Sequence, residues 1–250
     1  MTVQDEKETA RANLISTLRG EIATVLPRAP AGSTAGVTKN DDLYEAYLWC
    51  LVLQAARRRG YTDIEILDRH GATPKDVRLR RGPGRLSVVH QYTHAVLKLP
   101  PRQSETGLCL GADELEVHVG VRVRGRSGVL HEADVLVLPA RIARQRRTDR
   151  EDPHWCDPYV VIEAKYYSDK ISLSLGRGFS GLMSELLRAR GIFASTVPNP
   201  KIRDLLEHLG HVAVFGVGPG TLAEEVMKEE IGRILRCQCQ YQKSPCWEHR

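Results

Sequence analysis

The segment at residues 159–166 constrains the possible folds most strongly. It is nearly continuous in apolar residues, and Glu163 and Lys165 are its two charged positions. Successive side chains of a strand point to opposite faces of the sheet, so a strand that is apolar at successive positions is buried on both faces. We therefore expect a sheet that is covered by helices on both sides.

The surrounding sequence predicts the order of the elements. Residues 115–123 alternate between apolar and polar side chains, which is typical of a half-exposed strand, and a turn at 126–128 joins them to a second strand at 129–138. The other predicted elements are a helix at 40–59 that stops at Gly60, extended segments at 63–67 and 86–97, a charged loop at 141–158, helices at 173–189, 201–209 and 221–236, and strands at 192–197 and 212–217. A helix, a hairpin that leads into a third strand and a βαβ unit together predict an α/β fold with a central mixed sheet flanked by helices.

The chain is expected to divide into three parts. Residues 1–39 are predicted to form an N-terminal helix and linker, because apolar residues at helical spacing precede a stretch rich in Pro, Ala, Gly and Ser. Residues 40–236 are predicted to form the main domain, and residues 237–250 a C-terminal tail. A chain of 250 residues with 42% hydrophobic residues can bury one substantial core.

Several classes of protein lack support in the sequence. No apolar run reaches the roughly 18 residues that a membrane-spanning helix needs, and the N-terminus is polar, so no membrane association and a cytoplasmic location are expected. The six cysteines form no dense framework and are expected to be free thiols. Walker A, Gly-x-Ser-x-Gly and HExxH motifs are missing, and the G-x-G-x-x-G pattern at 176–181 does not directly follow a strand, which argues against a dinucleotide site.

The charge distribution is compatible with a nucleic-acid partner. The net charge is +5 with a pI near 8.9, and arginines cluster in four segments, at 57–59, 78–85, 122–126 and 141–150. Arginine contacts phosphate in a bidentate manner, and phosphate contacts dominate nucleic-acid affinity. A solvated basic surface is the alternative for each cluster.

The pattern within 159–166 also carries chemistry. Glu163 and Lys165 are two positions apart, so on a strand they emerge on one face. Asp134 lies in the preceding predicted strand, immediately before a hydrophobic run, and a buried carboxylate needs a cation, a hydrogen-bond network or a function. If the two strands are neighbours, Asp134 and Glu163 can reach one hard divalent ion such as Mg²⁺.

This arrangement resembles the PD-(D/E)xK, or restriction-endonuclease-like, nuclease superfamily over roughly residues 40–217. Asp134 matches the first acid of the motif, and Glu163, Ala164 and Lys165 match its E-x-K, whereas Ala133 stands where many members have proline. The resemblance implies an αβββαβ core in which Asp134, Glu163 and the Ala164 carbonyl bind Mg²⁺ or Mn²⁺. It also implies that Lys165 orients or deprotonates the attacking water and stabilises the charge that develops on the phosphate.

Glu45 is a further candidate catalytic residue and metal ligand. On the predicted helix at 40–59 it shares an apolar face with Leu48, Trp49 and Val52, and superfamily members often place a glutamate on this first helix, pointing into the metal site. The alternative is a capping box with Asp42. For Glu163 and Lys165, the alternative is a charge pair on an exposed edge strand.

Two further sets of residues have weaker signals. Lys170 and Arg177 are proposed to face the cleft and contact phosphate. In the tail, Cys237, Cys239, Cys246 and His249 have a spacing that can ligate zinc, although the C-x-C step is tighter than usual and a frayed tail with free thiols is the default.

The sequence thus predicts a Mg²⁺- or Mn²⁺-dependent endonuclease that hydrolyses DNA phosphodiester bonds in restriction or antiviral defence. DNA is preferred to RNA because most relatives of this architecture cut DNA, and a homodimer or a partner subunit is compatible with two-strand cleavage. The alternatives are a nucleic-acid-binding or assembly module that keeps the fold without cutting, and an unrelated α/β enzyme that acts on a small phosphorylated or nucleotide substrate.

Overall fold

The computed structural model describes residues 40–86, 92–98, 114–187 and 189–236, together with residues 13, 16, 17 and 20. Those four isolated residues are helical, and the Thr17 hydroxyl donates a hydrogen bond of 2.9 Å to the Asn13 carbonyl. The rest of the predicted N-terminal helix and linker, and the whole predicted tail with its four candidate zinc ligands, lie outside the described residues.

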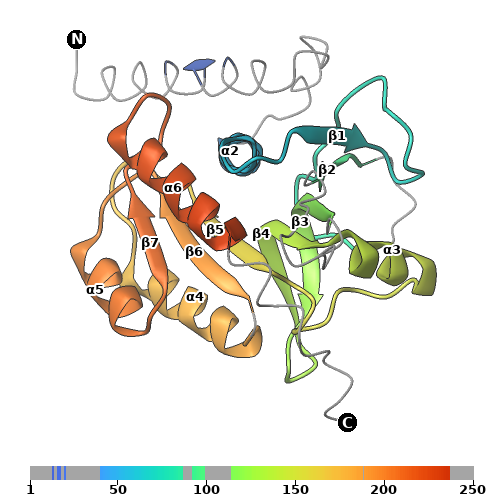
Figure 1. Cartoon of the computed structure of the whole chain (residues 1–250). Coiled ribbons are helices and arrows are strands. Elements are labelled where there is room, and N and C mark those ends of the chain that lie inside the picture. Colours follow the sequence, from blue (N-terminus) through green and yellow to red (C-terminus); the bar gives the residue numbers. More distant parts are fainter. Residues whose placement is uncertain are drawn as a thin grey trace, which may run out of the picture.

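A seven-stranded sheet forms the centre of the described part of the chain (Figure 1). In sheet order, which is also chain order, the strands are β1 (Asp63–Leu67), β2 (His94–Lys98), β3 (Leu115–Arg124), β4 (Leu130–Pro139), β5 (Val160–Lys165), β6 (Arg190–Ser195) and β7 (Val212–Phe215). Neighbours from β1 to β5 run antiparallel, whereas β5, β6 and β7 run parallel. The predicted α/β class with a mixed sheet is therefore confirmed.

Helices cover both faces of the sheet, as the apolar pattern of β5 requires (Figure 1). The helices of the main domain are α2 (Asn40–Arg58), α3 (Ala140–Asp149), α4 (Leu173–Glu185), α5 (Pro200–His208) and α6 (Leu222–Arg236). One hydrophobic core contains residues of α2 and α6, and a second core, on the other face, contains residues of α3, α4 and α5. No helix in the described ranges is both long enough and apolar enough to cross a membrane.

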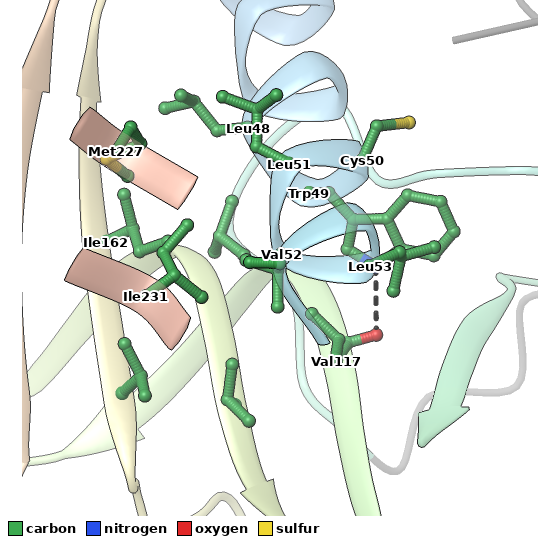
Figure 2. Packing of buried hydrophobic residues seen from close by; sticks show 14 of the residues in the cluster. Leu48, Trp49, Cys50, Leu51, Val52, Leu53, Val117, Ile162, Met227 and Ile231 are labelled. Atoms are coloured by element: carbon green, nitrogen blue, oxygen red, sulfur yellow. Dashed lines mark hydrogen bonds between the residues drawn. The ribbon is translucent and has the colours of Figure 1, made fainter. Parts of the chain in front are cut away.

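Helix α2 is the central element of the first core. Trp49 is fully buried, and its Nε1 donates a hydrogen bond of 3.0 Å to the Val117 carbonyl of β3, while the neighbouring apolar side chains meet Met227 and Ile231 of α6 (Figure 2). Burying one such large apolar side chain stabilises the fold by about 1.5–3 kcal/mol. The helix is followed by Gly60 at φ +91, a conformation that favours glycine.

The prediction of a loop at 141–158 is wrong for residues 141–149, which belong to α3. Arginine is a good helix former, but the helix buries Ala140 and Ala143 alone, so its apolar stripe is too short to be recognised from sequence. Tertiary ion pairs hold it in place instead. Arg146 and Arg147 of its last turn bind Asp157 and Glu116.

The prediction that β3 is half-exposed is also wrong. Its polar residues Glu116 and His118 are 1% and 3% exposed, because Arg147 of α3 pairs with Glu116 and residues 80–86 lie along the strand. The extended segment predicted at 86–97 is confirmed as a strand only from residue 94, where β2 (His94–Lys98) begins. Leu86 lies outside any strand, and residues 87–91 are outside the described ranges.

The expectation of free thiols holds for Cys50, which is a buried free cysteine. It is wrong for Cys156, which is disulfide-bonded. Spacing alone did not reveal this bond, because disulfide pairing depends on which cysteines the fold brings within a Cα separation of about 4.4–6.8 Å.

Candidate metal centre

Asp134 and Glu163 lie where two paired strands begin to diverge. The last residue pair between β4 and β5 is Val135 with Ile162. Beyond it, the adjacent residue of β4 is Asp134 and the adjacent residue of β5 is Glu163. Beyond this pair, Asp134 Oδ2 accepts a hydrogen bond of 2.7 Å from the Ala164 backbone N–H. A side-chain carboxylate thus replaces the backbone partner at this point, which fixes Asp134 beside the E-x-K segment.

A distortion opposite Asp134 sets the direction of its side chain. Val119 of β3 packs into the first core, whereas Val121, two residues further on, packs into the second core on the other face. The regular alternation of side chains is therefore interrupted at Gly120, where φ is +60. Strand β4 makes the same change between Val135 and Ala133, on either side of Asp134. A Cβ on Gly120 would lie 3.0 Å from the Gly82 carbonyl oxygen, so the close approach of residues 80–86 also requires glycine here.

Lys165 joins the two carboxylates. Its Nζ lies 2.6 Å from Glu163 Oε1 and 3.5 Å from Asp134 Oδ2. The three side chains are 21%, 18% and 11% exposed in the order Lys165, Glu163, Asp134, so water still reaches them. The structure therefore brings together the three predicted motif residues, and since β5 lies between β4 and β6, the alternative of an edge-strand charge pair is wrong.

Glu45 supplies another carboxylate to the same region. Its Oε2 atom is buried and has no hydrogen-bond partner among the described residues. Burial, followed by the negative charges of Asp134, Glu132 and Asp42, raises the pKa of Glu45 to about 9. Helix α2 begins at Asn40, so Asp42 lies inside the helix and is not its N-cap, which removes the basis of the capping-box alternative.

The site holds more carboxyl groups than its single lysine can neutralise. Burial, followed by the charge of Asp134, raises the pKa of Glu163 to about 7, and burial also raises the pKa of Asp134. Burial would lower the pKa of the Lys165 ammonium, but Asp134 and Glu163 outweigh that effect and raise it above its ordinary value. Additional positive charge would therefore be stabilised here.

Glu132 belongs to this acidic region and was missed from the sequence. It is half-buried on β4, and burial together with the charge of Asp134 raises its pKa. The sequence feature that could have indicated Glu132 is its position two residues before Asp134, because residues two apart on a regular strand share one face of the sheet. That rule does not hold here, since the alternation of faces is interrupted at Asp134.

The donor set fits a hard divalent cation. Carboxylates and a backbone carbonyl are the ligands that Mg²⁺ and Mn²⁺ prefer, and the unpartnered Glu45 Oε2 has unused capacity to accept such an ion. The carboxylates do not form a closed cage, because the one group of three or more ligating side chains found within 4.8 Å in the described ranges lies elsewhere. Mg²⁺ typically takes one or two protein carboxylates and keeps several waters, so a closed cage is not required.

The two predicted phosphate contacts are not joined to this centre. Lys170 follows β5 and Arg177 lies on α4, and both are exposed. No hydrogen bond or ion pair between described residues connects either side chain with Asp134 or Glu163. Their proposed contact with phosphate stays a prediction.

A second group of possible ligands was not predicted. His94, Glu116 and His118 are buried, and their ligand atoms lie within 4.8 Å of one another, so this group could hold a metal ion. The alternation of residues 115–123 places His118 on the polar face of the predicted strand, and no local spacing connects it with His94 on another strand.

Comparison with known proteins adds no family assignment. A scan against models of protein families finds no match for this chain. A search of curated proteins finds none either. A search of solved structures also finds none.

Proposed function

We propose that this protein is a divalent-metal-dependent phosphodiesterase of the PD-(D/E)xK type that cleaves DNA. The observation that carries the proposal is the meeting of Asp134, Glu163 and Lys165 where β4 and β5 diverge. Glu45 adds a buried, unpartnered oxygen, and the charge of Asp134 contributes to the raised pKa of this residue. Structural ion pairs rarely leave a buried carboxylate oxygen unsatisfied, whereas functional sites do.

The element order supports the same proposal. Helix α2, the β3–β4 hairpin, β5, the crossover helix α4 and the parallel strand β6 follow the αβββαβ order that the motif implies. Strands β1 and β2 at one end of the sheet, helix α3 between β4 and β5, and the C-terminal β7 and α6 would then be additions around this core.

The chain's own residues suggest how the ion would be held. Asp134, Glu163 and the Ala164 carbonyl would bind Mg²⁺ or Mn²⁺, and Glu45 would bind a second ion or a metal-bound water. When bound, the ion supplies Lewis-acid polarisation of the phosphate and lowers the pKa of a coordinated water.

The resemblance gives Lys165 two possible roles, to orient or to deprotonate the attacking water. Burial would lower the pKa of Lys165, but the charges of Asp134 and Glu163 raise it, which favours the ammonium form and hence the first role. It can donate hydrogen bonds to that water and to the phosphate oxygens, where negative charge increases as the transition state forms. We therefore assign Lys165 to orientation and charge stabilisation.

DNA is the proposed substrate, and restriction or antiviral defence is the proposed setting. The net charge of +5 favours association with a polyanion. Cleavage of both strands of a duplex is compatible with two such centres, which a homodimer or a partner subunit would provide.

Cleavage assays with matched variants test this proposal. Plasmid, linear duplex, single-stranded DNA and RNA are incubated with the protein and Mg²⁺, Mn²⁺ or EDTA. Asp134→Asn, Lys165→Met and Glu45→Gln are compared with the controls Asp204→Asn and Lys201→Met, which change exposed residues of α5. Metal-dependent cleavage that is lost in Asp134→Asn and Lys165→Met, and kept in both controls, is the expected result.

Two outcomes would contradict the proposal. Salt-sensitive DNA binding without cleavage under any metal condition would favour the alternative of a nucleic-acid-binding module that does not cut. The open arrangement of the carboxylates is compatible with that alternative as well. Cleavage that persists in Asp134→Asn would show that the active site lies elsewhere.

A further inference from the structure

The buried group of His94, Glu116 and His118 has a geometry that hydrogen bonding does not fully explain. His118 Nε2 lies 2.9 Å from Glu116 Oε2, a hydrogen-bond distance, whereas His94 Nε2 lies 3.6 Å from the same oxygen, which is too far for one. The two rings are stacked, with centroids 5.0 Å apart and an interplanar angle of 17°. Both Nε2 atoms are thus directed towards one carboxylate oxygen.

The distances from the two Nε2 atoms to Glu116 Oε2 are close to those between neighbouring ligand atoms around one small metal ion. Zinc bonds of about 2.0–2.1 Å in a tetrahedral site place neighbouring ligand atoms about 3.3 Å apart. The observed separations of 2.9 and 3.6 Å from Glu116 Oε2 lie on either side of that value. Two imidazoles and one carboxylate form a ligand set typical of Zn²⁺ and related borderline ions, unlike the all-oxygen set at Asp134 and Glu163.

The surroundings hold these side chains in a form suited to ligation. Arg147 donates to both oxygens of Glu116, at 2.5 and 2.7 Å, and so fixes the carboxylate from outside, as partners of ligating carboxylates commonly do. His94 and His118 are 5% and 3% exposed, so the surrounding packing holds both rings in place.

A pocket gives access to the group. It has a volume of about 240 Å³ and is lined by His94 and Glu116 together with the basic residues Lys98, Arg144 and Arg147. An ion could enter through it, and a water could complete the coordination from this side. His118 lies behind the other two ligands, fully enclosed.

We propose that His94, Glu116 and His118 form a binding site for a Zn²⁺-class ion that joins β2 to β3 and stabilises this side of the sheet. This site is separate from the proposed phosphodiesterase centre and does not depend on it. Its ligands come from two strands, so the bound ion cross-links two neighbouring strands that backbone pairs and packing otherwise hold together.

Spectroscopy with Co²⁺ as the probe tests this site directly. The full-length protein is freed of metal and titrated with Co²⁺ in an Asp134→Asn/Glu163→Gln background, so that the other centre does not contribute. We expect visible d–d bands that saturate at one equivalent, disappear when Zn²⁺ is added, and lack the near-ultraviolet thiolate charge-transfer band. Thermal unfolding should show a higher Tm with Zn²⁺ than with EDTA.

Variants separate this site from other ligands. His94→Gln should weaken Co²⁺ binding by at least about 100-fold while the metal-free Tm stays close to that of the parent. His208→Asn, at an exposed histidine of α5, should change neither property. His118→Gln is a second test, and if it does not fold, the titration of the parent and of His94→Gln still decides the question.

Several results would overturn the proposal. Absence of d–d bands in the parent protein would show that the histidines and Glu116 form a hydrogen-bonded network without metal. A thiolate charge-transfer band that persists in His94→Gln would assign the ion to cysteines, such as those of the C-terminal tail. An unchanged Tm with Zn²⁺ would remove the stabilising role.

Discussion

Replacing Glu45 with glutamine is expected to stabilise the metal-free protein at alkaline pH while it impairs cleavage. The pKa of Glu45 is raised from 4.5 to about 9 in the folded protein, chiefly by burial. Between these values the folded protein keeps a proton that the unfolded chain has released, so the folded state loses stability as pH rises from about 4.5 to about 9. Glutamine does not titrate and removes this loss.

The size of the effect follows from the pKa values. Each pH unit in this window costs up to about 1.4 kcal/mol, so the upper limit at pH 8 is about 5 kcal/mol. Glu45 is half-buried, so solvent screens part of this penalty, and we expect a measured gain of about 2 kcal/mol for Glu45→Gln at pH 8. At pH 5 the gain should be close to zero.

Urea unfolding in EDTA at pH 5, 7, 8 and 9 measures this difference, with Glu207→Gln, an exposed residue of α5, as control. Adding Mg²⁺ should stabilise the parent protein more than the Glu45→Gln variant, because a ligand that binds the folded state adds to its stability. A difference between parent and variant that is the same at pH 5 and pH 9 would refute the assignment of Glu45 as a buried, uncompensated acid.

Three other substitutions test the residues that position the site. Lys165→Met should lower kcat by at least about 100-fold while calorimetry still detects Mn²⁺ binding, and loss of Mn²⁺ binding would contradict the assigned role. Gly120→Ala should lower the urea unfolding free energy by about 2 kcal/mol, because φ is +60 and the added Cβ would meet the Gly82 carbonyl; an unchanged value would refute the claim that this position requires glycine. Trp49→Phe should cost about 2 kcal/mol in the same assay through the lost hydrogen bond to Val117 and the lost volume, and a neutral result would mean that the core closes around the smaller ring.

The parts of the fold that depend on local patterns could be predicted from the sequence. The apolar run of β5 and its two charged residues determine the strand, its burial and the shared face of Glu163 and Lys165. The long apolar helix α2 and the β3–β4 hairpin are likewise set by periodicity and turn residues. That is enough to bring Asp134 beside the E-x-K segment once the strands pair.

The parts that depend on long-range contacts could not be predicted. Helix α3 shows little amphipathic pattern, and its arginines are held by Glu116 and Asp157, which lie on other elements. Residues 80–86 cover β3 only because Gly120 permits a close backbone approach, and this burial is what turns His118 from a surface residue into a possible metal ligand. Pairing of β2 with β3 is needed to bring His94 beside it.

The central claim is that the divergence of β4 and β5 holds a divalent cation, and anomalous diffraction from crystals soaked in Mn²⁺ tests it most directly. The account predicts an anomalous peak within bonding distance of Asp134, Glu163 and the Ala164 carbonyl, with Lys165 moved away from one or both carboxylates. A peak confined to His94, Glu116 and His118, or no peak while Lys165 still bridges Asp134 and Glu163, would contradict it.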